Sequence, residues 1–312
     1  MIHNDLCKGC KYCLYGLKSV LFITGLCEQH CYYCPVSNER FGKDVMYIND
    51  KLVKNFEKDI LEELDKCFSN GIAITGGEPL LVIDRVVKIS RLLKREYGSN
   101  FHIHMYIHVS ALCKENLKKL LSSEVDEVRI HSISLSQVMS KIDLLYIIKD
   151  SNIELGLEIP AIPGLESEIV NMIEYLCSNS LISFLNINEL DVSPRNENEF
   201  LKRKFKFTIY GSVEGSLKTG LKIAEIVYRK YSWLKINVCS TRSKDQIQIS
   251  SRLFRRNLRI SQYYDLVNDD GTLSRVIINS KYFHPLNVKN LEKGRYLKIL
   301  KMNDREVILE EY

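Results

Sequence analysis

The sequence predicts an α/β protein in which repeated βα units build a parallel sheet. From about residue 19 onward, short apolar strands alternate with amphipathic helices, which is the order of elements that such units produce. Polar and apolar side chains also alternate along several of the strands, so the two faces of the sheet differ. The chain has 312 residues, of which 45% are hydrophobic, and this is enough to bury one large core with an appendage.

The predicted elements form six βα units in chain order. The first strand covers 19–24, and the helix after it keeps apolar residues at helical spacing over 53–68 and is closed by Gly71. The second strand begins near Ile72, and a second helix over about 84–97 is followed by another glycine. Further strands are expected at 101–109, 127–133, 153–160 and 183–188.

The polar face of this sheet is the first sign of a binding site. In the third strand, His102, His104 and His108 share one face, whereas Ile103 and Met105 share the other. Parallel strands that are buried on both faces read instead as continuous apolar runs. If helices cover the apolar faces, the polar faces line a lumen that holds a ligand or water. The alternative is an open sheet whose polar face is solvated.

Three cysteines at close spacing follow the first strand. Cys27, Cys31 and Cys34 form a CxxxCxxC motif at the carboxyl end of that strand, where βα barrels place their chemistry. Thiolates are ligands of iron–sulfur clusters and of zinc. Zinc needs a fourth ligand, and His30 lies inside the motif but is poorly placed to supply it. The motif therefore predicts a metal centre in which one metal position has no local protein ligand.

This motif resembles that of the radical S-adenosylmethionine (SAM) superfamily. The shared features are the CxxxCxxC spacing, Tyr33 before the last cysteine, and the sequence Thr75-Gly76-Gly77-Glu78-Pro79 at the end of the second strand. The resemblance implies a partial (β/α)6 radical SAM barrel with an N-terminal Cys-rich segment and a C-terminal α+β extension. The competing interpretation is a zinc loop next to a Gly-Gly turn.

The resemblance also implies a mechanism and a set of cofactor contacts. Cys27, Cys31 and Cys34 would hold a [4Fe–4S] cluster whose remaining iron binds SAM, and reduction would cleave SAM to a 5′-deoxyadenosyl radical that abstracts a substrate hydrogen. An electron donor such as ferredoxin or flavodoxin is expected. Glu78 is expected to complement the charge of the methionyl amine, and no residue is assigned a catalytic role. The residues implied in SAM binding are Tyr33, Gly76, Gly77, Glu78, Pro79, Ser110, His131, Glu158 and Asn188.

A second group of cysteines precedes the first strand. Cys7, Cys10 and Cys13 form a CxxCxxC motif, and Cys239 ends a predicted strand far along the chain. Together they predict a tetrathiolate site for zinc or for a second [4Fe–4S] cluster, and the compact spacing favours the cluster. The alternative is that the first three are free thiols and that Cys239 is a small buried residue. The cysteines expected to be incidental are Cys67, Cys113 and Cys177.

The last third of the chain is basic, although the net charge of the whole chain is only +5. Arginines and lysines between Arg242 and Arg259 are interleaved with apolar residues. This segment either binds nucleic acid or phosphate, or anchors a helix whose arginines are solvated or paired with acidic residues. Strands at 275–280 and 296–310, the latter broken by a turn at Asn303-Asp304, predict a small β-rich appendage.

The chain is expected to comprise four parts. They are a Cys-rich metal-binding segment (1–18), a radical SAM core barrel (19–195), a basic α/β extension that packs on the barrel (196–270) and the β-rich appendage (271–312). The N-terminal sequence lacks the pattern of a secretory signal, and no apolar run reaches the roughly 18 residues of a membrane span. A cytoplasmic protein without a membrane partner is therefore predicted.

Several functions stay open at this point. The nearest resemblance is to uncharacterised archaeal proteins related to the pyruvate formate-lyase activating enzymes, and it rests on 7–13, 20–27, 186–190, and Lys244-Asp245 near Arg252. This kinship implies an activase that makes a glycyl radical on a partner, whereas the basic segment suggests an RNA-modifying enzyme. The substrate is expected to be a small molecule or RNA. A non-catalytic zinc protein that scaffolds a partner-binding surface is the alternative from a different class.

Overall fold

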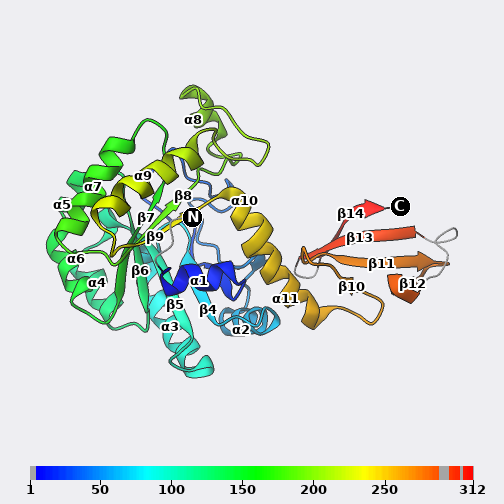
Figure 1. Cartoon of the computed structure of the whole chain (residues 1–312). Coiled ribbons are helices and arrows are strands. Elements are labelled where there is room, and N and C mark those ends of the chain that lie inside the picture. Colours follow the sequence, from blue (N-terminus) through cyan, green and yellow to red (C-terminus); the bar gives the residue numbers. More distant parts are fainter. Residues whose placement is uncertain (1–4, 288–294, 303–304, 312) are drawn as a thin grey trace.

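A computed structural model of the protein describes residues 5–287, 295–302 and 305–311. In it, a nine-stranded sheet forms the body of the protein. Its order is β3-β2-β1-β4-β5-β6-β7-β8-β9 (Figure 1). The strands β1, β4, β5, β6, β7, β8 and β9 pair in parallel with one another in that order. The strands β2 and β3 form an antiparallel hairpin, and β2 pairs antiparallel with β1. The predicted α/β class with a parallel sheet is confirmed. The strands are β1 (Lys18–Phe22), β2 (Tyr47–Ile48), β3 (Lys51–Leu52), β4 (Gly71–Thr75), β5 (His102–His108), β6 (Glu127–His131), β7 (Glu154–Pro160), β8 (Phe184–Asn188) and β9 (Lys235–Cys239).

The six predicted strands correspond to β1 and β4–β8, and β9 adds a further parallel strand. The register of β9 places Cys239 beside Asn188, the last residue of β8. The strand that ends with Cys239 is therefore part of the main sheet. Its side chains Asn237 and Cys239 face the same side as the polar residues of the other strands, because alternate residues of a strand share a face.

Helices cover the outer, apolar face of this sheet (Figure 1). Ile72, Ile103 and Val128 on that face are fully buried, as are Ile89 and Leu93 on α3. Local sequence sets several of the helix ends; for example, the side chain of Asn55 accepts a hydrogen bond from the backbone N–H of Lys58 at the start of α2. The helices on this face are α2 (Phe56–Lys66), α3 (Ile83–Tyr97), α4 (Lys114–Leu121), α5 (Leu135–Met139), α6 (Ile142–Lys149), α7 (Glu166–Ser178) and α9 (Ser216–Lys230). The short helix α8 (Glu197–Lys202) lies instead beside the loop that follows β1, where the ring of Phe200 contacts that of Tyr32.

The N-terminal helix α1 (Lys8–Leu14) packs against the polar face of the sheet instead. It contacts β1, β4 and β5, and the backbone N–H of Gly9 donates to the Glu127 carboxylate at 3.0 Å. A Cβ atom at Gly9 would lie 2.5–2.6 Å from side-chain atoms of Arg129, Glu127 and His104. Glycine at this position therefore lets α1 approach the start of β6 closely and close that end of the lumen.

The basic segment forms a continuous helical element that packs on the barrel. It comprises α10 (Thr241–Ser243), a π-helix (Lys244–Ile249) and α11 (Ser250–Ile260). The buried Arg256 pairs with Glu63 of α2 at 3.0 Å, and Arg255 donates to the carbonyl of Tyr15 at 3.2 Å. Of the two interpretations of this segment, the contacts favour the one in which its arginines anchor a helix.

Replacing Arg256 tests this anchoring role. Arg256→Met leaves the buried Glu63 carboxylate without its cation, so we expect the free energy of unfolding to fall by about 3 kcal/mol. The matched control is Arg259→Met on the same helix, since the exposed Arg259 side chain only lies over the ring of Phe68 at 5.0 Å; its cost should stay under about 1 kcal/mol. Urea unfolding of both variants, prepared anaerobically, measures the difference, and equal costs would contradict the anchoring role.

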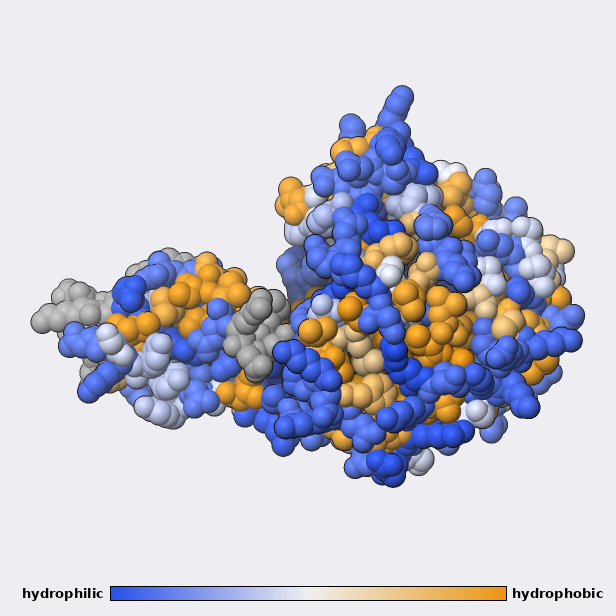
Figure 2. Space-filling view, turned by 180° about the vertical axis from the view of Figure 1, so that it is seen from behind, coloured by the Kyte–Doolittle hydropathy of each residue, from blue (hydrophilic) through white to orange (hydrophobic). Residues whose placement is uncertain are grey.

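A small antiparallel sheet follows α11 and projects from the body (Figures 1 and 2). Its order is β10-β11-β13-β14, with β12 paired to β11. The appendage strands that the sequence predicts correspond to β11, β13 and β14, whereas the predicted turn at Asn303-Asp304 lies outside the described residues. Its strands are β10 (Leu266–Val267), β11 (Leu273–Ile278), β12 (Lys281–Phe283), β13 (Arg295–Met302) and β14 (Arg305–Glu311).

Candidate functional site

A cavity of about 470 Å³ occupies the polar face of the sheet. Every parallel strand contributes to its lining, either by a side chain of the strand or by the loop that follows it. The polar faces that the sequence alternation predicts therefore line a lumen. The sequence-predicted residues at the lining are Cys27, Cys31, Cys34, Tyr33, Gly76, Gly77, Glu78, Pro79, His131, Glu158 and Asn188, together with Cys10, Cys13 and Cys239; Cys7 and Ser110 lie outside it.

The loop that carries Cys27, Cys31 and Cys34 leaves the carboxyl end of β1 and returns at β2. Its base is closed by backbone hydrogen bonds from Gly25 N–H to the carbonyl of Lys43 at 2.8 Å and from Gly42 N–H to the carbonyl of Gly25 at 2.7 Å. All three thiols are partly exposed to the cavity. Burial raises the pKa of Cys27 and of Cys31. These thiols are therefore protonated near neutral pH until a cation displaces the protons.

The spacing of these three thiols fits a cluster better than a single ion. Among the described residues, two groups of three have ligand atoms within 4.8 Å of one another, and neither is the cysteine triplet. Ligands of one zinc ion converge on it at about 2.3 Å from sulfur, whereas the thiolates of a [4Fe–4S] cluster each bind a different iron and lie further apart. The triplet is thus spaced too widely for one zinc ion without rearrangement of the loop.

Of the two compact groups, the one that contains Glu127 does not resemble an ion site. One contains Cys31, His108 and His131 and belongs to the rim beside the cysteine loop; the other contains His102, His104 and Glu127. In the second group, Lys18 lies 2.6 Å from His102, and Arg129 lies 2.7 Å from Glu127. Arg129 contacts this carboxylate and Lys18 contacts the neighbouring His102, so an additional cation is disfavoured there.

The Gly-Gly-Glu-Pro loop lies directly against the start of the cysteine loop. The backbone N–H of Gly77 donates to the carbonyl of Thr24 at 2.7 Å, and that of Glu78 donates to the carbonyl of Leu26 at 2.7 Å. A Cβ atom at Gly77 would collide with the carbonyl of Leu26. Glycine is therefore required here for the approach of two backbones, which is a reason that the sequence alone did not reveal.

Glu78 connects this loop to the end of β5. Its buried carboxylate accepts hydrogen bonds from the backbone N–H of Leu80 at 3.0 Å and of His108 at 2.7 Å. Burial raises the pKa of Glu78 to about 7, although the two N–H donors oppose the increase. The side chain is therefore close to its midpoint of ionisation at neutral pH.

Tyr33 and His131 form a hydrogen-bonded pair at the rim. The Tyr33 hydroxyl lies 2.9 Å from Nε2 of His131, and Nδ1 of His131 lies 2.9 Å from the carbonyl oxygen of Glu158. Burial lowers the pKa of His131, so its ring is neutral. Because a carbonyl can only accept, Nδ1 carries the proton and Nε2 accepts from the tyrosine.

His108 is a site residue that the sequence interpretation did not select. It lines the cavity next to Cys31 and His131, and its Nδ1 accepts from the backbone N–H of Ser110 at 3.2 Å. Ser110 does not line the cavity; its hydroxyl lies 2.7 Å from the same nitrogen and orients the ring. The position of His108 as the last polar-face residue of its strand was the signal that could have identified it.

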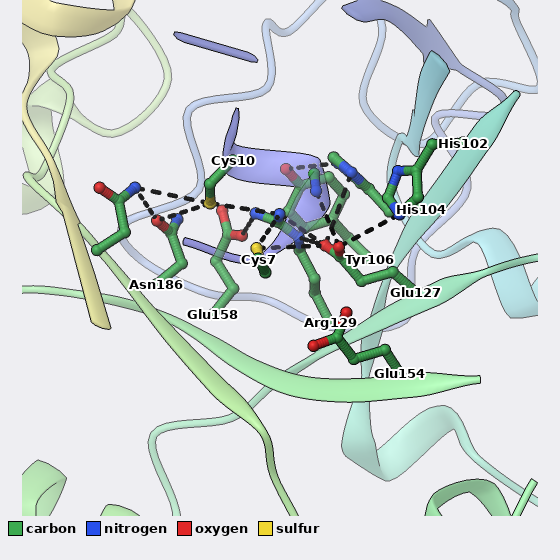
Figure 3. A network of polar contacts seen from close by, with 12 residues as sticks. Cys7, Cys10, His102, His104, Tyr106, Glu127, Arg129, Glu154, Glu158 and Asn186 are labelled. Atoms are coloured by element: carbon green, nitrogen blue, oxygen red, sulfur yellow. Dashed lines mark hydrogen bonds and ion pairs between the residues drawn. The ribbon is translucent and has the colours of Figure 1, made fainter. Parts of the chain in front are cut away.

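Glu158 and Asn188 are joined to Arg129. The guanidinium of Arg129 lies 2.6 Å from Glu158, and the amide of Asn188 donates to the other oxygen of Glu158 at 2.7 Å. Arg129 is almost completely buried, as is Glu127, its second carboxylate partner. Arg129 thus joins two carboxylates, those of Glu127 and Glu158 (Figure 3).

The second cysteine group meets this arginine. Cys7 and Cys10 of the α1 region are buried, and their sulfurs lie 3.3 and 3.4 Å from Nη2 of Arg129 (Figure 3). Cys13 and Cys239 line the same cavity as Cys10. The structure therefore brings residues that are more than 200 positions apart in the sequence into one part of the lumen.

Two comparisons with known proteins agree with this geometry. A family model described as the radical SAM superfamily matches residues 21–176. A protein of Methanocaldococcus jannaschii, whose name provisionally describes it as a glycyl-radical enzyme activating enzyme, is 38% identical over 284 residues, which are 88% of this chain and 74% of that protein.

Comparison with solved structures gives a weaker similarity. The radical SAM methyltransferase TsrM from Kitasatospora setae, solved with tryptophan substrate and a SAM analogue, aligns with a TM-score of 0.42 and 14% identity over 64% of this chain. The present chain spans 41% of the length of that methyltransferase. In the part of the chain that the structure describes, no helix is long and apolar enough to cross a membrane.

Proposed function

The chain belongs to the radical SAM superfamily and is a radical SAM enzyme, and from this membership we propose that Cys27, Cys31 and Cys34 hold its [4Fe–4S] cluster and that SAM binds in the adjoining cavity. One observation carries the proposal: the cysteine loop and the Gly-Gly-Glu-Pro loop are hydrogen-bonded to each other at the rim of one cavity. When bound, the cluster supplies the electron that cleaves SAM reductively, which yields a 5′-deoxyadenosyl radical able to abstract a substrate hydrogen.

The residues around the cluster loop are proposed to bind and orient SAM. Gly76, Gly77 and Pro79 line the cavity wall, and Glu78, which also lines it, is the carboxylate proposed to attract the methionyl ammonium. The neutral His131 holds the Tyr33 hydroxyl and thereby fixes the tyrosine ring, which is proposed to lie near the adenine. Glu158, paired with Arg129, and Asn188, which donates to Glu158, supply polar groups on the opposite strands.

The ionisation of Glu78 makes a testable difference to SAM binding. Its pKa is about 7 instead of the ordinary 4.5, so raising the pH from 6 to 7.5 creates the carboxylate that attracts the ammonium. We expect the Kd for SAM to fall by up to about tenfold over this range, because binding that shifts the pKa of Glu78 by one unit changes the Kd about tenfold. In Glu78→Gln, the Kd should be higher and nearly independent of pH. Equilibrium binding to the reconstituted protein measures both.

The same pKa has the opposite effect on the fold without SAM. Because the folded pKa lies above the unfolded one, ionised Glu78 lowers the free energy of unfolding progressively as the pH rises from 4.5 to about 7. Glu115→Gln, an exposed change on α4, is the matched control, and its free energy of unfolding should depend on pH as that of the wild type does.

For SAM binding, a Kd that still depends on pH in Glu78→Gln would contradict the assignment of Glu78.

We propose a polypeptide as the substrate, since the relative from Methanocaldococcus jannaschii is named as an activating enzyme. A glycyl-radical activase uses the abstraction step on a glycine of its partner protein. RNA is the second candidate, but three arginines of α11, Arg255, Arg256 and Arg259, contact the body of the protein. Unchanged weak binding of bulk tRNA between low and high salt would argue against RNA. A small-molecule substrate is tested by identifying what co-purifies under anaerobic conditions.

The remaining partners follow from the same chemistry. We propose that a ferredoxin or flavodoxin delivers the electron and that the protein works in the cytoplasm, where reducing conditions protect its free thiols. We also propose that Cys7, Cys10, Cys13 and Cys239 hold a second metal centre, either a second [4Fe–4S] cluster or zinc. The division into a metal-binding segment, a barrel, a basic extension and an appendage is proposed with the boundaries given above.

The experiment that tests the function is anaerobic reconstitution with iron and sulfide, followed by reduction in the presence of SAM. The expected result is a brown protein that forms 5′-deoxyadenosine. A protein that contains only zinc and leaves SAM intact under strong reductant would contradict the proposal and favour the non-catalytic scaffold.

A further inference from the structure

The second cysteine group has the geometry and the hydrogen-bond donors of a complete metal site. Cys10 and Cys13 extend from α1 into the cavity, and Cys239 faces it from the end of β9. The Cys13 thiol lies within electrostatic range of both Cys10 and Cys239. Cys7 lies behind Cys10, with Arg129 bridging the two sulfurs. Three thiols from two distant segments thus line one part of the lumen, and the thiol of Cys7 contacts that of Cys10 beside it.

Nitrogen donors are directed at these sulfurs. Besides Arg129, the side-chain amide of Asn237 donates to Cys10 at 3.7 Å, and that of Gln248 donates to Cys239 at 3.3 Å. Sulfur accepts weakly as a neutral thiol and much more strongly as a thiolate. A buried guanidinium and two amides arranged in this way therefore match an anionic, metal-bound set of sulfurs better than four neutral thiols.

Arg129 also solves an electrostatic problem at this site. Oε1 of Glu127 lies 3.8 Å from the sulfur of Cys7, so a thiolate there would face a carboxylate. The guanidinium contacts both groups, at 2.7 Å from Glu127 and 3.3 Å from Cys7, and its positive charge offsets the repulsion. A thiolate at Cys7 is thus compatible with the buried Glu127 only while Arg129 is in place.

The separation of the sulfurs disfavours a single zinc ion. In a tetrahedral zinc site with Zn–S distances of about 2.3 Å, the sulfurs lie roughly 3.8 Å from one another. No three of these four cysteines, all of which the structure describes, have sulfurs mutually within 4.8 Å. A [4Fe–4S] cluster accepts a wider spacing because each cysteine binds a separate iron, and it requires the thiols of Cys7 and Cys10, which contact each other here, to move apart.

We propose that Cys7, Cys10, Cys13 and Cys239 bind a second [4Fe–4S] cluster, and that Arg129 and Gln248 donate hydrogen bonds to its thiolates. This inference deepens the proposed function and rests on it, because the two clusters share one lumen. All four irons of the second cluster have a cysteine ligand. It has no position for SAM and is chemically distinct from the cluster on Cys27, Cys31 and Cys34.

Metal counting in matched variants of the full chain tests the site. After anaerobic reconstitution, the wild type should hold about eight iron atoms, and C27A/C31A/C34A and C7A/C10A/C13A about four each. The control Cys177→Ala, at a buried cysteine of α7 outside both groups, should retain all of them. Cys239→Ala, which leaves α1 intact, should lose this cluster or convert it to a three-iron form with its own electron paramagnetic resonance signal.

The outcomes separate this inference from the proposed function. Three results would overturn the second cluster and leave the first intact. They are an unchanged iron content in C7A/C10A/C13A, a wild-type chain that holds four irons and about one zinc, and a disulfide between Cys7 and Cys10 in place of metal. If the wild type holds only four irons, all of them lost in C7A/C10A/C13A and none in C27A/C31A/C34A, the second cluster stands and the proposed function fails.

A reduction potential provides an independent readout. Hydrogen bonds to cluster sulfurs raise the potential, so Gln248→Leu should shift the midpoint of the second cluster to more negative values with its iron content unchanged. Gln246→Leu on the same π-helix is the control, because Gln246 is exposed and accepts from Arg242 instead. The midpoint potentials are measured in the C27A/C31A/C34A background. Equal midpoint potentials for Gln248→Leu and Gln246→Leu would overturn the assigned hydrogen bond.

Discussion

Cys27→Ala is expected to abolish the formation of 5′-deoxyadenosine from SAM. The remaining thiols, Cys31 and Cys34, cannot hold a cluster that keeps one iron open, because at least two irons would then lack a protein ligand. We expect activity to fall below about one thousandth of the wild-type rate, since the uncatalysed cleavage contributes nothing measurable. Quantifying deoxyadenosine by liquid chromatography after reduction measures this directly.

Cys113→Ala provides the matched control for the cysteine loss. Cys113 is exposed at the start of α4 and is remote from both cysteine groups, so its removal should leave iron content and activity unchanged. Deoxyadenosine production that survives in Cys27→Ala at more than a few per cent would show that the cluster has other ligands.

Arg129→Met is expected to be the most destabilising single substitution in the barrel. Arg129 is 2% exposed, and its loss leaves Glu127 and Glu158 as buried carboxylates without a cation between them. Breaking a buried ion pair costs about 3–5 kcal/mol, and with two carboxylates involved we expect the upper end of that range. Urea unfolding of the anaerobically reconstituted protein is the measurement.

The surface offers a control of the same chemistry for this substitution. Arg95 pairs with Glu96 at 2.9 Å, and its side chain is 69% exposed, so Arg95→Met should cost less than about 1 kcal/mol. A similar small cost for Arg129→Met would mean that water enters the lumen and solvates both carboxylates, and the arginine would then lose its role in holding the site.

The sequence was sufficient to predict the parallel sheet and the cysteine loop, because both depend on local patterns. Period-two alternation identified β5 and its polar face, and cysteine spacing identified the loop after β1. The partners of these residues could not be predicted. Glu78 accepts from His108, which is 30 positions away, and Arg256 reaches Glu63 across 193 positions, so only the folded chain reveals either contact.

The same limit explains the interpretation of the basic segment. Arginines at this density are compatible with RNA binding or with a packed helix, and composition does not distinguish the two. The outcome depends on Glu63 and on the carbonyl of Tyr15, which lie far from α11 in the sequence. For Cys239, the sequence supplied the strand but not its pairing with β8, which is what brings the thiol into the lumen.

The N-terminal helix has an unusual position in the order of synthesis. α1 precedes every strand that it contacts, and Gly9 bonds Glu127 across 118 positions, whereas Cys10 accepts from Asn237 across 227. The strands β1, β4 and β5 and the residue Glu127 are therefore made well before Asn237. The helix can dock on these strands during synthesis, but its contact with Asn237 forms only after β9 has been made and has paired with β8.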